Sequence, residues 1–389
     1  MGAKWKGAAG LAADVRYYGE WMRERAFERI GHLYPKHKGE TVIAWLWART
    51  VISPNPAVNA PAPLVRSFVL SKKKGRECWA KPVIQETTVR FEVTKGLPPR
   101  DEDGTVKRTG ARCIISSEPI PFDYIRAEGK AGRMGAQLMA IVTEGKRGRS
   151  YYSPAEEQAR IAESAEPEWE PVGDVPEQAL GFRVQLYGMD EYHKLFTPRQ
   201  LTALTTFSDL VHEARELATR DALAVFTTRR EGEPSTGELA DGDESPSLFM
   251  GEGFGVGAHD DRPLREGGRG ARAYGEAVSV YLAFAVDKGA DYWSTITGWH
   301  VNRQTMGHTF TRQAIAMTWD YAEGNPFSDS TGKFIGAIDW QWRILLKLAD
   351  PGRSTMVEGT VIQTDAKASI NYRFSTPPKK IHAFSMLAA

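Results

Sequence analysis

The stretch Thr197-Pro198-Arg199-Gln200-Leu201 marks the start of the clearest helix in this sequence of 389 residues. Threonine three positions before glutamine is the pattern of a capping box, and proline suits the first helical position. Apolar residues then recur at steps of three or four: Leu201, Leu204, Phe207, Val211, Ala214 and Ala218. This spacing predicts an amphipathic helix that begins at Pro198.

Outward from this helix, the chain alternates between helical and β-prone stretches. Apolar residues at helical spacing predict a packing helix from Leu11 to Ile30 that is closed by Gly31 and Pro35. Short runs separated by Pro, Gly and Lys predict strands at Thr41–Trp47, Leu64–Leu70, Thr87–Val93 and Ala111–Ile115. Helical patterning returns at Ala271–Tyr292, about Thr309–Ala322 and about Ile335–Leu348, and Gly359–Ile370 is typical of a strand and turn.

These patterns predict a mixed α/β chain of five regions. They are an N-terminal helical segment (1–40), a β-rich module (41–150), a Pro- and Glu-rich linker (151–195), a helical region (196–350) and a final segment (351–389). An acidic, Gly-rich loop (229–270) interrupts the helical region. It contains the string Phe249-Met250-Gly251-Glu252-Gly253, which we interpret as loop because it does not lie between a buried strand and a helix.

Composition limits the class of protein. The longest apolar runs, such as Val278–Val286, are shorter than the roughly 18 residues of a membrane span, and the N-terminus has no signal-peptide pattern. We therefore expect a cytoplasmic protein with no membrane partner. Two cysteines, Cys78 and Cys113, are too few for a disulfide framework or for a zinc site built on cysteine alone.

The formal net charge of +1 conceals two basic stretches. Residues 64–95 hold eight basic and three acidic side chains (8 − 3 = +5), and residues 126–149 hold six and two (6 − 2 = +4). Both stretches are candidates for contact with phosphate, and Lys130 and Arg133 of the second are candidate DNA contacts. The alternative is that they are the solvated faces of a hairpin and a helix.

The remaining polar groups give weaker signals. His32 with His37, His300 with His308, and His193 lack the ligand spacing of a catalytic zinc site, so we predict no metal. Residues Trp299 to Thr305 mix an aromatic ring with several hydrogen-bond donors, as a base-reading or phosphate-contacting segment does. A buried helix junction is the alternative interpretation.

Several long strings resemble the large adenine-specific DNA methylases that contain a zinc ribbon and an N-terminal domain of unknown function. They are Asp14–Gly19, Arg29–Pro35, Ile43–Thr50, Pro121–Lys130, Leu195–Leu201 and Asn325–Ser328. The resemblance covers nearly the whole chain up to about Ser375. It implies a Rossmann-like domain that binds S-adenosylmethionine (SAM), and N6-methylation of adenine in DNA after base flipping.

The resemblance also shows where this chain departs from the family. The zinc-ribbon cysteines correspond to Ser53, Val58, Cys113 and Ser116, so only one thiol remains and zinc is not expected. The D-P-P-Y motif of the target-base site corresponds to Thr376-Pro377-Pro378-Lys379, and the glycine motif of the SAM site would precede the matched region.

From this we expect a partial, Rossmann-like methyltransferase core that begins near residue 351, preceded by the degenerate zinc-ribbon-like module. Asp365 is the candidate SAM-binding residue, and Pro377 and Pro378 are the remnant of the target-base loop. Arg303 and Arg312 are further candidate DNA contacts. We expect an inactive fragment when the chain is alone. The alternatives are one subunit of a split methyltransferase, completed by a partner, and a non-catalytic DNA-binding module.

Overall fold

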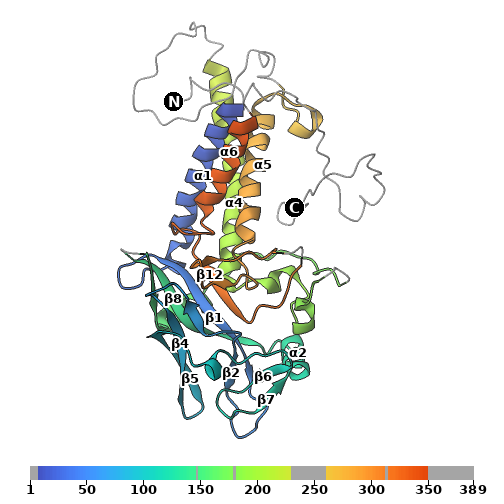
Figure 1. The fold of residues 1–389 in the computed structure, drawn as a ribbon. Coiled ribbons are helices and arrows are strands. Elements are labelled where there is room, and N and C mark those ends of the chain that lie inside the picture. The colour runs from blue at the N-terminus through green and yellow to red at the C-terminus, as the bar shows by residue number, and fades with distance from the viewer. Residues whose placement is uncertain (1–7, 146–147, 178–180, 229–259, 312–313, 349–389) are drawn as a thin grey trace. The chain divides into compact units, whose positions relative to one another are not determined.

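The computed structural model describes residues 8–145, 148–177, 181–228, 260–311 and 314–348. Within these residues the chain is a mixed α/β protein with six α-helices and a curled antiparallel sheet (Figure 1). The chain forms two compact units: unit 1 comprises residues 1–22, 208–287 and 338–389, and unit 2 comprises residues 23–207 and 288–337.

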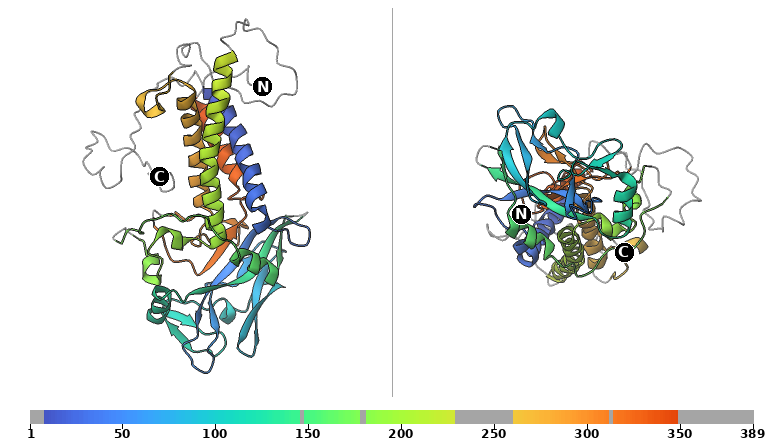
Figure 2. Two further views of the ribbon diagram at one scale, coloured as in Figure 1. Left: turned by 180° about the vertical axis from the view of Figure 1, so that it is seen from behind. Right: turned by 90° about the horizontal axis from the view of Figure 1, so that it is seen from below.

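Unit 1 is built from helices that run side by side in both side views (Figures 1 and 2). The helices that contribute to it are α1 (Ala8–Ile30), α4 (Pro198–Thr228), α5 (Ala271–Ala290) and α6 (Phe334–Leu348), with the short η7 (Leu264–Glu266) before α5. Tyr18 of α1 donates a hydrogen bond to Asp221 of α4 at 3.1 Å. Gly19 lets α6 approach closely, because a Cβ there would lie 2.6 Å from Ile338 Cδ1.

Unit 2 is organised around strand β1 (Val42–Ile52), which is buried along all but its last residue. It pairs antiparallel with β12 (Asp320–Gly324), β8 (Gly135–Gly145) and β2 (Pro61–Leu64), and β9 (Gly148–Tyr152) extends the sheet beyond β8. A strand that is covered on both faces explains why its sequence is apolar at consecutive positions instead of alternating.

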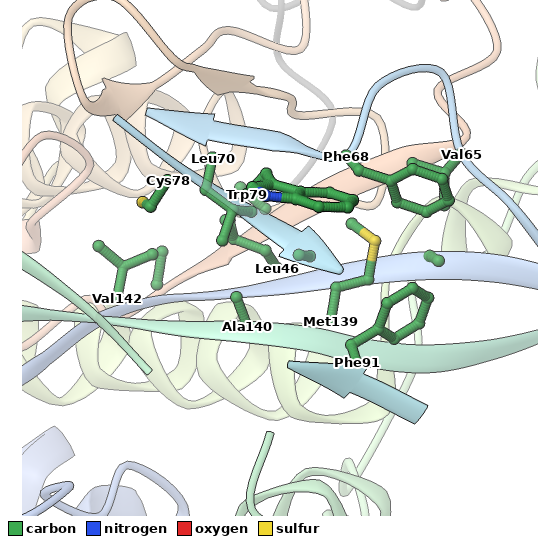
Figure 3. Packing of buried hydrophobic residues seen from close by; sticks show 14 of the residues in the cluster. Leu46, Val65, Phe68, Leu70, Cys78, Trp79, Phe91, Met139, Ala140 and Val142 are labelled. Carbon is green, nitrogen blue, oxygen red and sulfur yellow. The ribbon is translucent and has the colours of Figure 1, made fainter. Parts of the chain in front are cut away.

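A second sheet, formed by β3 (Val69–Ser71), β4 (Cys78–Gln85) and β5 (Thr88–Lys95), provides the other side of the main core. Figure 3 shows Trp79 and Phe91 from this sheet together with Leu46 of β1 and Met139 of β8. The other elements of unit 2 are short: η2 (Gly31–Leu33), η3 (Arg100–Glu102), β6 (Gly110–Arg112), β7 (Pro119–Pro121), α2 (Phe122–Lys130), α3 (Glu156–Glu163), η4 (Val184–Tyr187), η5 (Tyr192–Leu195), β10 (Trp299–His300) and β11 (Thr305–Met306).

The capping box at the start of α4 is confirmed. The Thr197 N–H donates to Gln200 Oε1 at 2.9 Å, and the Gln200 N–H donates to Thr197 Oγ1 at 3.1 Å. Each side chain thereby satisfies a backbone donor that the first helical turn leaves without a partner. The predicted apolar face is buried from Leu201 to Ala218. The helices predicted near residues 11–30, 271–292 and 335–348 are also present as α1, α5 and α6.

The helix predicted at about Thr309–Ala322 is wrong. Residues 320–324 instead form strand β12, in which Tyr321 and Ala322 lie opposite Trp47 and Leu46 of β1. The period-3.6 pattern was misleading because tertiary pairing with β1 determines the conformation of this short segment.

Two further expectations are modified. The run Leu64–Leu70 is interrupted and divides between β2 and β3. The segment predicted as a Pro- and Glu-rich linker (151–195) contains helix α3, which is held to β1 because the Trp45 indole N–H donates to Gln158 at 2.8 Å. The strands of the described main sheet pair antiparallel, whereas a Rossmann-like core needs parallel strands. Residues 351–389, where that core was expected to begin, lie outside the described residues.

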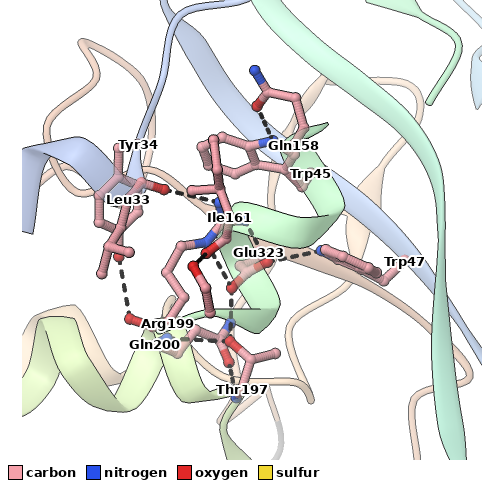
Figure 4. A network of polar contacts seen from close by, with 11 residues as sticks. Leu33, Tyr34, Trp45, Trp47, Gln158, Ile161, Thr197, Arg199, Gln200 and Glu323 are labelled. Carbon is pink, nitrogen blue, oxygen red and sulfur yellow. Dashed lines mark hydrogen bonds and ion pairs between the residues drawn. The ribbon is translucent and has the colours of Figure 1, made fainter. Parts of the chain in front are cut away.

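A buried ion pair joins the start of α4 to the edge of the main sheet (Figure 4). The side chains of Arg199 and Glu323 are 0% and 1% exposed. Glu323 accepts two hydrogen bonds from the guanidinium, at 3.1 and 2.7 Å, one from the Thr197 hydroxyl at 2.7 Å and one from the Trp47 indole at 2.8 Å. The remaining terminal nitrogen of Arg199 donates to the Leu33 carbonyl at 3.0 Å.

Aromatic rings complete the surroundings of Arg199. Its guanidinium carbon lies 3.8 Å from the ring centroid of Trp45 and 5.4 Å from that of Tyr34. Burial of two charges carries a desolvation cost that is offset only when every lone pair and proton has a partner. Four donors saturate the Glu323 carboxylate, and Arg199 gives three hydrogen bonds while its guanidinium stacks on Trp45, so the pair joins α4, β1 and β12.

We predict that Glu323→Gln lowers the free energy of unfolding by about 3–5 kcal/mol, because it leaves the buried Arg199 charge without a counter-ion. Chemical denaturation followed by circular dichroism measures the loss. Asp123→Asn, which breaks an exposed pair with Arg126, is the control and should have a much smaller effect. Equal losses in the two variants would contradict the role assigned to the buried pair.

Candidate nucleic-acid interface

Two hairpin connections in unit 2 contain the four positions that the resemblance assigns to zinc-ribbon cysteines. The β1–β2 connection holds Ser53 and Val58, and its ends are joined by the Ser53 N–H, which donates to Ala60 O at 2.9 Å. In the β6–β7 connection the Cys113 N–H donates to Glu118 O at 2.8 Å. Both turns therefore close with a backbone hydrogen bond across their ends.

The two connections also share an unusual backbone conformation. Asn59, which follows Val58, has φ +39°, and Ser117, which follows Ser116, has φ +64°. Residues other than glycine rarely adopt this left-handed region, so each connection reverses the chain sharply, directly after a cysteine-equivalent position. Each connection is therefore a tight turn at the end of a β-hairpin.

The two connections meet at Cys113. Burial raises the pKa of its thiol, but hydrogen bonds from the Ser53 hydroxyl, from the N–H and hydroxyl of Ser116 and from the Ile115 N–H bring that pKa below its ordinary value. Val58 packs on the same hydrophobic cluster that contains Cys113. Ser53 and Ser116 thus both act on the pKa of the Cys113 thiol, and Val58 packs on the same core.

These residues do not fit a zinc ion. Structural zinc takes four thiolate or imidazole ligands, whereas this cluster provides one thiol, two hydroxyls and an apolar side chain. Within the described ranges, no group of three or more His, Cys, Asp and Glu side chains could hold a metal. The second cysteine, Cys78, lies in the other core cluster, where burial raises its pKa to about 12.

We predict that the triple variant Ser53→Cys, Val58→Cys, Ser116→Cys binds one zinc ion per chain, because four thiols would then converge on the position of Cys113. Metal analysis after dialysis against a weak chelator measures the stoichiometry. A matched variant that also carries Cys113→Ser is the control and should bind zinc more weakly. A folded triple variant that retains no zinc would show that the four positions do not form a ribbon site.

In the second basic stretch, residues 126–149, three of the four described cations form ion pairs. Arg133 donates two hydrogen bonds to Glu128, at 3.0 and 2.7 Å, and Arg126 pairs with Asp123 at 2.9 Å. Arg149 pairs with Glu144 at 2.9 Å. Lys130 is exposed at the end of α2. Arg133 therefore already has a carboxylate partner, which weakens its candidacy as a DNA contact.

The first basic stretch, residues 64–95, differs because the cations of its β3–β4 turn are exposed and not paired with any described carboxylate. The β3–β4 turn carries Lys72, Lys73, Lys74 and Arg76, and all four are exposed. The Arg76 N–H donates to Lys73 O at 2.8 Å, and Gly75 provides the positive φ of +74° that this tight turn requires. Within the described part of the chain, none of these four cations forms an ion pair with a carboxylate.

The segment Trp299 to Thr305 forms the β10–β11 hairpin, so it is not a helix junction. The hairpin is attached to β3 by three hydrogen bonds: the Trp299 indole donates to Leu70 O at 3.0 Å, the Gln304 amide donates to Ser71 Oγ at 3.0 Å, and the Lys72 N–H donates to Val301 O at 3.2 Å. Arg303 is exposed in its turn. Two turns that are distant in sequence are therefore fixed next to each other.

The structure thus brings Arg303 to the β3–β4 turn and leaves Lys130 at the end of α2 and Arg133 just after it. The hydrogen bond from Gln304 to Ser71, which joins the two turns, could not be predicted from the sequence. Each of the two side chains is an ordinary polar residue in its own segment. The other candidates, Asp365, Pro377, Pro378 and Arg312, lie outside the described residues.

Comparison of the chain with protein-family models, with curated proteins and with solved structures gave no match. Among the described helices, none combines the length and the apolar character needed to cross a membrane.

Proposed function

We propose that this chain is the DNA-handling part of an adenine-specific DNA methyltransferase with a degenerate zinc ribbon, and that it transfers no methyl group by itself. The observation that carries the proposal is the contact of Ser53 and Ser116 with the Cys113 thiol. The resemblance alone assigned these positions to one metal site, and they come from two separate hairpin connections. Their convergence at one sulfur therefore supports the resemblance independently of the sequence strings.

The expected lack of activity follows from the target-base motif. A flipped adenine is held by an acidic or amide side chain that accepts from its amine and by an aromatic ring that stacks on the base. Thr376 and Lys379 stand at those two positions here. A hydroxyl and an ammonium group supply neither the carbonyl acceptor nor the stacking surface, so methyl transfer would need a partner with its own intact motif.

We predict that the purified chain incorporates no methyl group from labelled SAM into duplex DNA, while it binds the same duplex with an affinity that falls with salt and does not depend on SAM. Scintillation counting and fluorescence anisotropy measure the two properties, with an active adenine methyltransferase as the positive control. Methyl incorporation above the protein-free blank would contradict the first part, and the absence of duplex binding would contradict the second.

The structure gives specific support to a second candidate, a DNA-binding module without any catalytic partner. The support is the set of exposed cations on two joined turns, which needs no cofactor to bind phosphate. The two candidates differ in one measurement. A subunit that co-purifies with the chain and restores methyl transfer identifies a split enzyme, whereas a chain that purifies alone and still binds duplex DNA is the binding module.

A further inference from the structure

We propose that the joined β3–β4 and β10–β11 turns form a surface that binds the phosphodiester backbone of duplex DNA. This paired-turn surface consists of Lys72, Lys73, Lys74, Arg76 and Arg303. The inference rests on the proposed DNA-handling function and assigns it to particular residues. Lys130 and Arg133, which were also predicted as DNA contacts, are not part of this surface.

The first argument is that the surface is held rigidly. Ser71, which immediately precedes the lysines, is fully buried and accepts the amide hydrogen bond of Gln304. The Lys72 backbone N–H bonds directly to the β10–β11 turn. Both turns are anchored to the main core through β3, whose Leu70 lies in the cluster shown in Figure 3. A fixed array of cations loses less conformational freedom on binding than a flexible tail does.

A third element also contacts this surface. The terminal nitrogen of Arg76 lies 2.6 Å from the point that a Cβ on Gly148 would occupy, and Gly148 has φ +117°. Glycine at the start of β9 therefore leaves room for the Arg76 guanidinium. This places the guanidinium against the first residue of β9.

The second argument is electrostatic. Five exposed cations are gathered on two adjacent turns, and among the described residues they have no carboxylate partner. Like charges at this density repel one another and favour an anionic ligand. By contrast, Glu128 and Asp123 of α2 form ion pairs with Arg133 and Arg126. These two arginines are thus paired with carboxylates, whereas the cations of the paired-turn surface are available to bind an anion.

The third argument concerns the kind of anion. The tip residues from Lys72 to Arg76 include no apolar side chain, whereas a membrane-binding surface inserts apolar residues between its cations. The turn ends the three-stranded sheet β3–β4–β5, and β3 is buried, so the turn offers its side chains to phosphate groups at the surface of a duplex. Exposed Asn302 beside Arg303 adds a group that can donate and accept hydrogen bonds. Duplex DNA fits these features better than a lipid surface or an acidic peptide.

The test compares two full-length variants with the same change in charge. The surface variant carries Lys72→Gln, Lys74→Gln and Arg303→Gln, and the control carries Arg90→Gln, Lys107→Gln and Arg108→Gln, which are exposed cations elsewhere in unit 2. Glutamine keeps much of each side chain, and circular dichroism checks that both variants fold. Anisotropy with a fluorescent duplex of mixed sequence is measured between about 50 and 200 mM salt, the range over which phosphate contacts are most evident.

We expect the surface variant to bind at least ten times more weakly than the unmodified chain, with a log–log salt slope less steep by about 2 to 3, since each lost phosphate contact removes roughly 0.9 from the slope. The control should bind within about twofold. Equal weakening in both variants, or none in the surface variant while the unmodified chain binds DNA, overturns the inference and leaves the proposed function standing. Failure of the unmodified chain to bind duplex DNA overturns both.

Lysine acetylation footprinting gives a second readout that does not depend on variants. DNA should protect Lys72, Lys73 and Lys74 from acetylation and should leave Lys81 and Lys107 reactive. Polyglutamate and phosphatidylserine vesicles serve as competing anions in the same assay. If either protects the three lysines at a lower concentration than DNA does, the surface is specific for another class of partner and the inference is overturned.

Discussion

The ion pair between Arg199 and Glu323 is the interaction on which the architecture of unit 2 depends. It places a charged side chain from the first turn of α4 against a carboxylate on β12, and both are removed from water. The cost of burying such a pair is offset by further hydrogen bonds, which Thr197, Trp47 and the Leu33 carbonyl supply. Thr197 both caps the helix and donates to Glu323, so a shift of α4 relative to β12 would remove partners from a buried charge.

The position of β12 beside β1 has consequences for the candidate interface. The segment between α5 and β12 leaves the core as the β10–β11 hairpin, and its Trp299 and Gln304 bond to β3. Arg303 is thereby carried to the lysines of the β3–β4 turn. The proposed DNA-binding surface is thus a product of core packing, in which buried hydrogen bonds position exposed charges. An interface supported in this way keeps its shape without the ligand, which lowers the entropic cost of binding.

The two turns around Cys113 place a thiol among hydroxyl and aliphatic groups that do not fit a metal ion. Ser53 and Ser116 interact with this thiol, and Val58 packs on the apolar cluster that contains it. Stability at this site then comes from the buried cluster around Ile120 and Ile125 and from backbone hydrogen bonds across each turn.

The sequence by itself determined the local elements: the capping box at Thr197 and Gln200, the helical period of α1, α4, α5 and α6, and the basic character of residues 72–76. These depend on neighbours within a few positions, so their signals are short-range. Only the tertiary structure decided that residues 320–324 form a strand, that Arg133 pairs with Glu128, and that Gln304 reaches Ser71. Strand pairing, ion pairing and burial join residues that are far apart in the chain, and no local pattern encodes which of several similar side chains will meet.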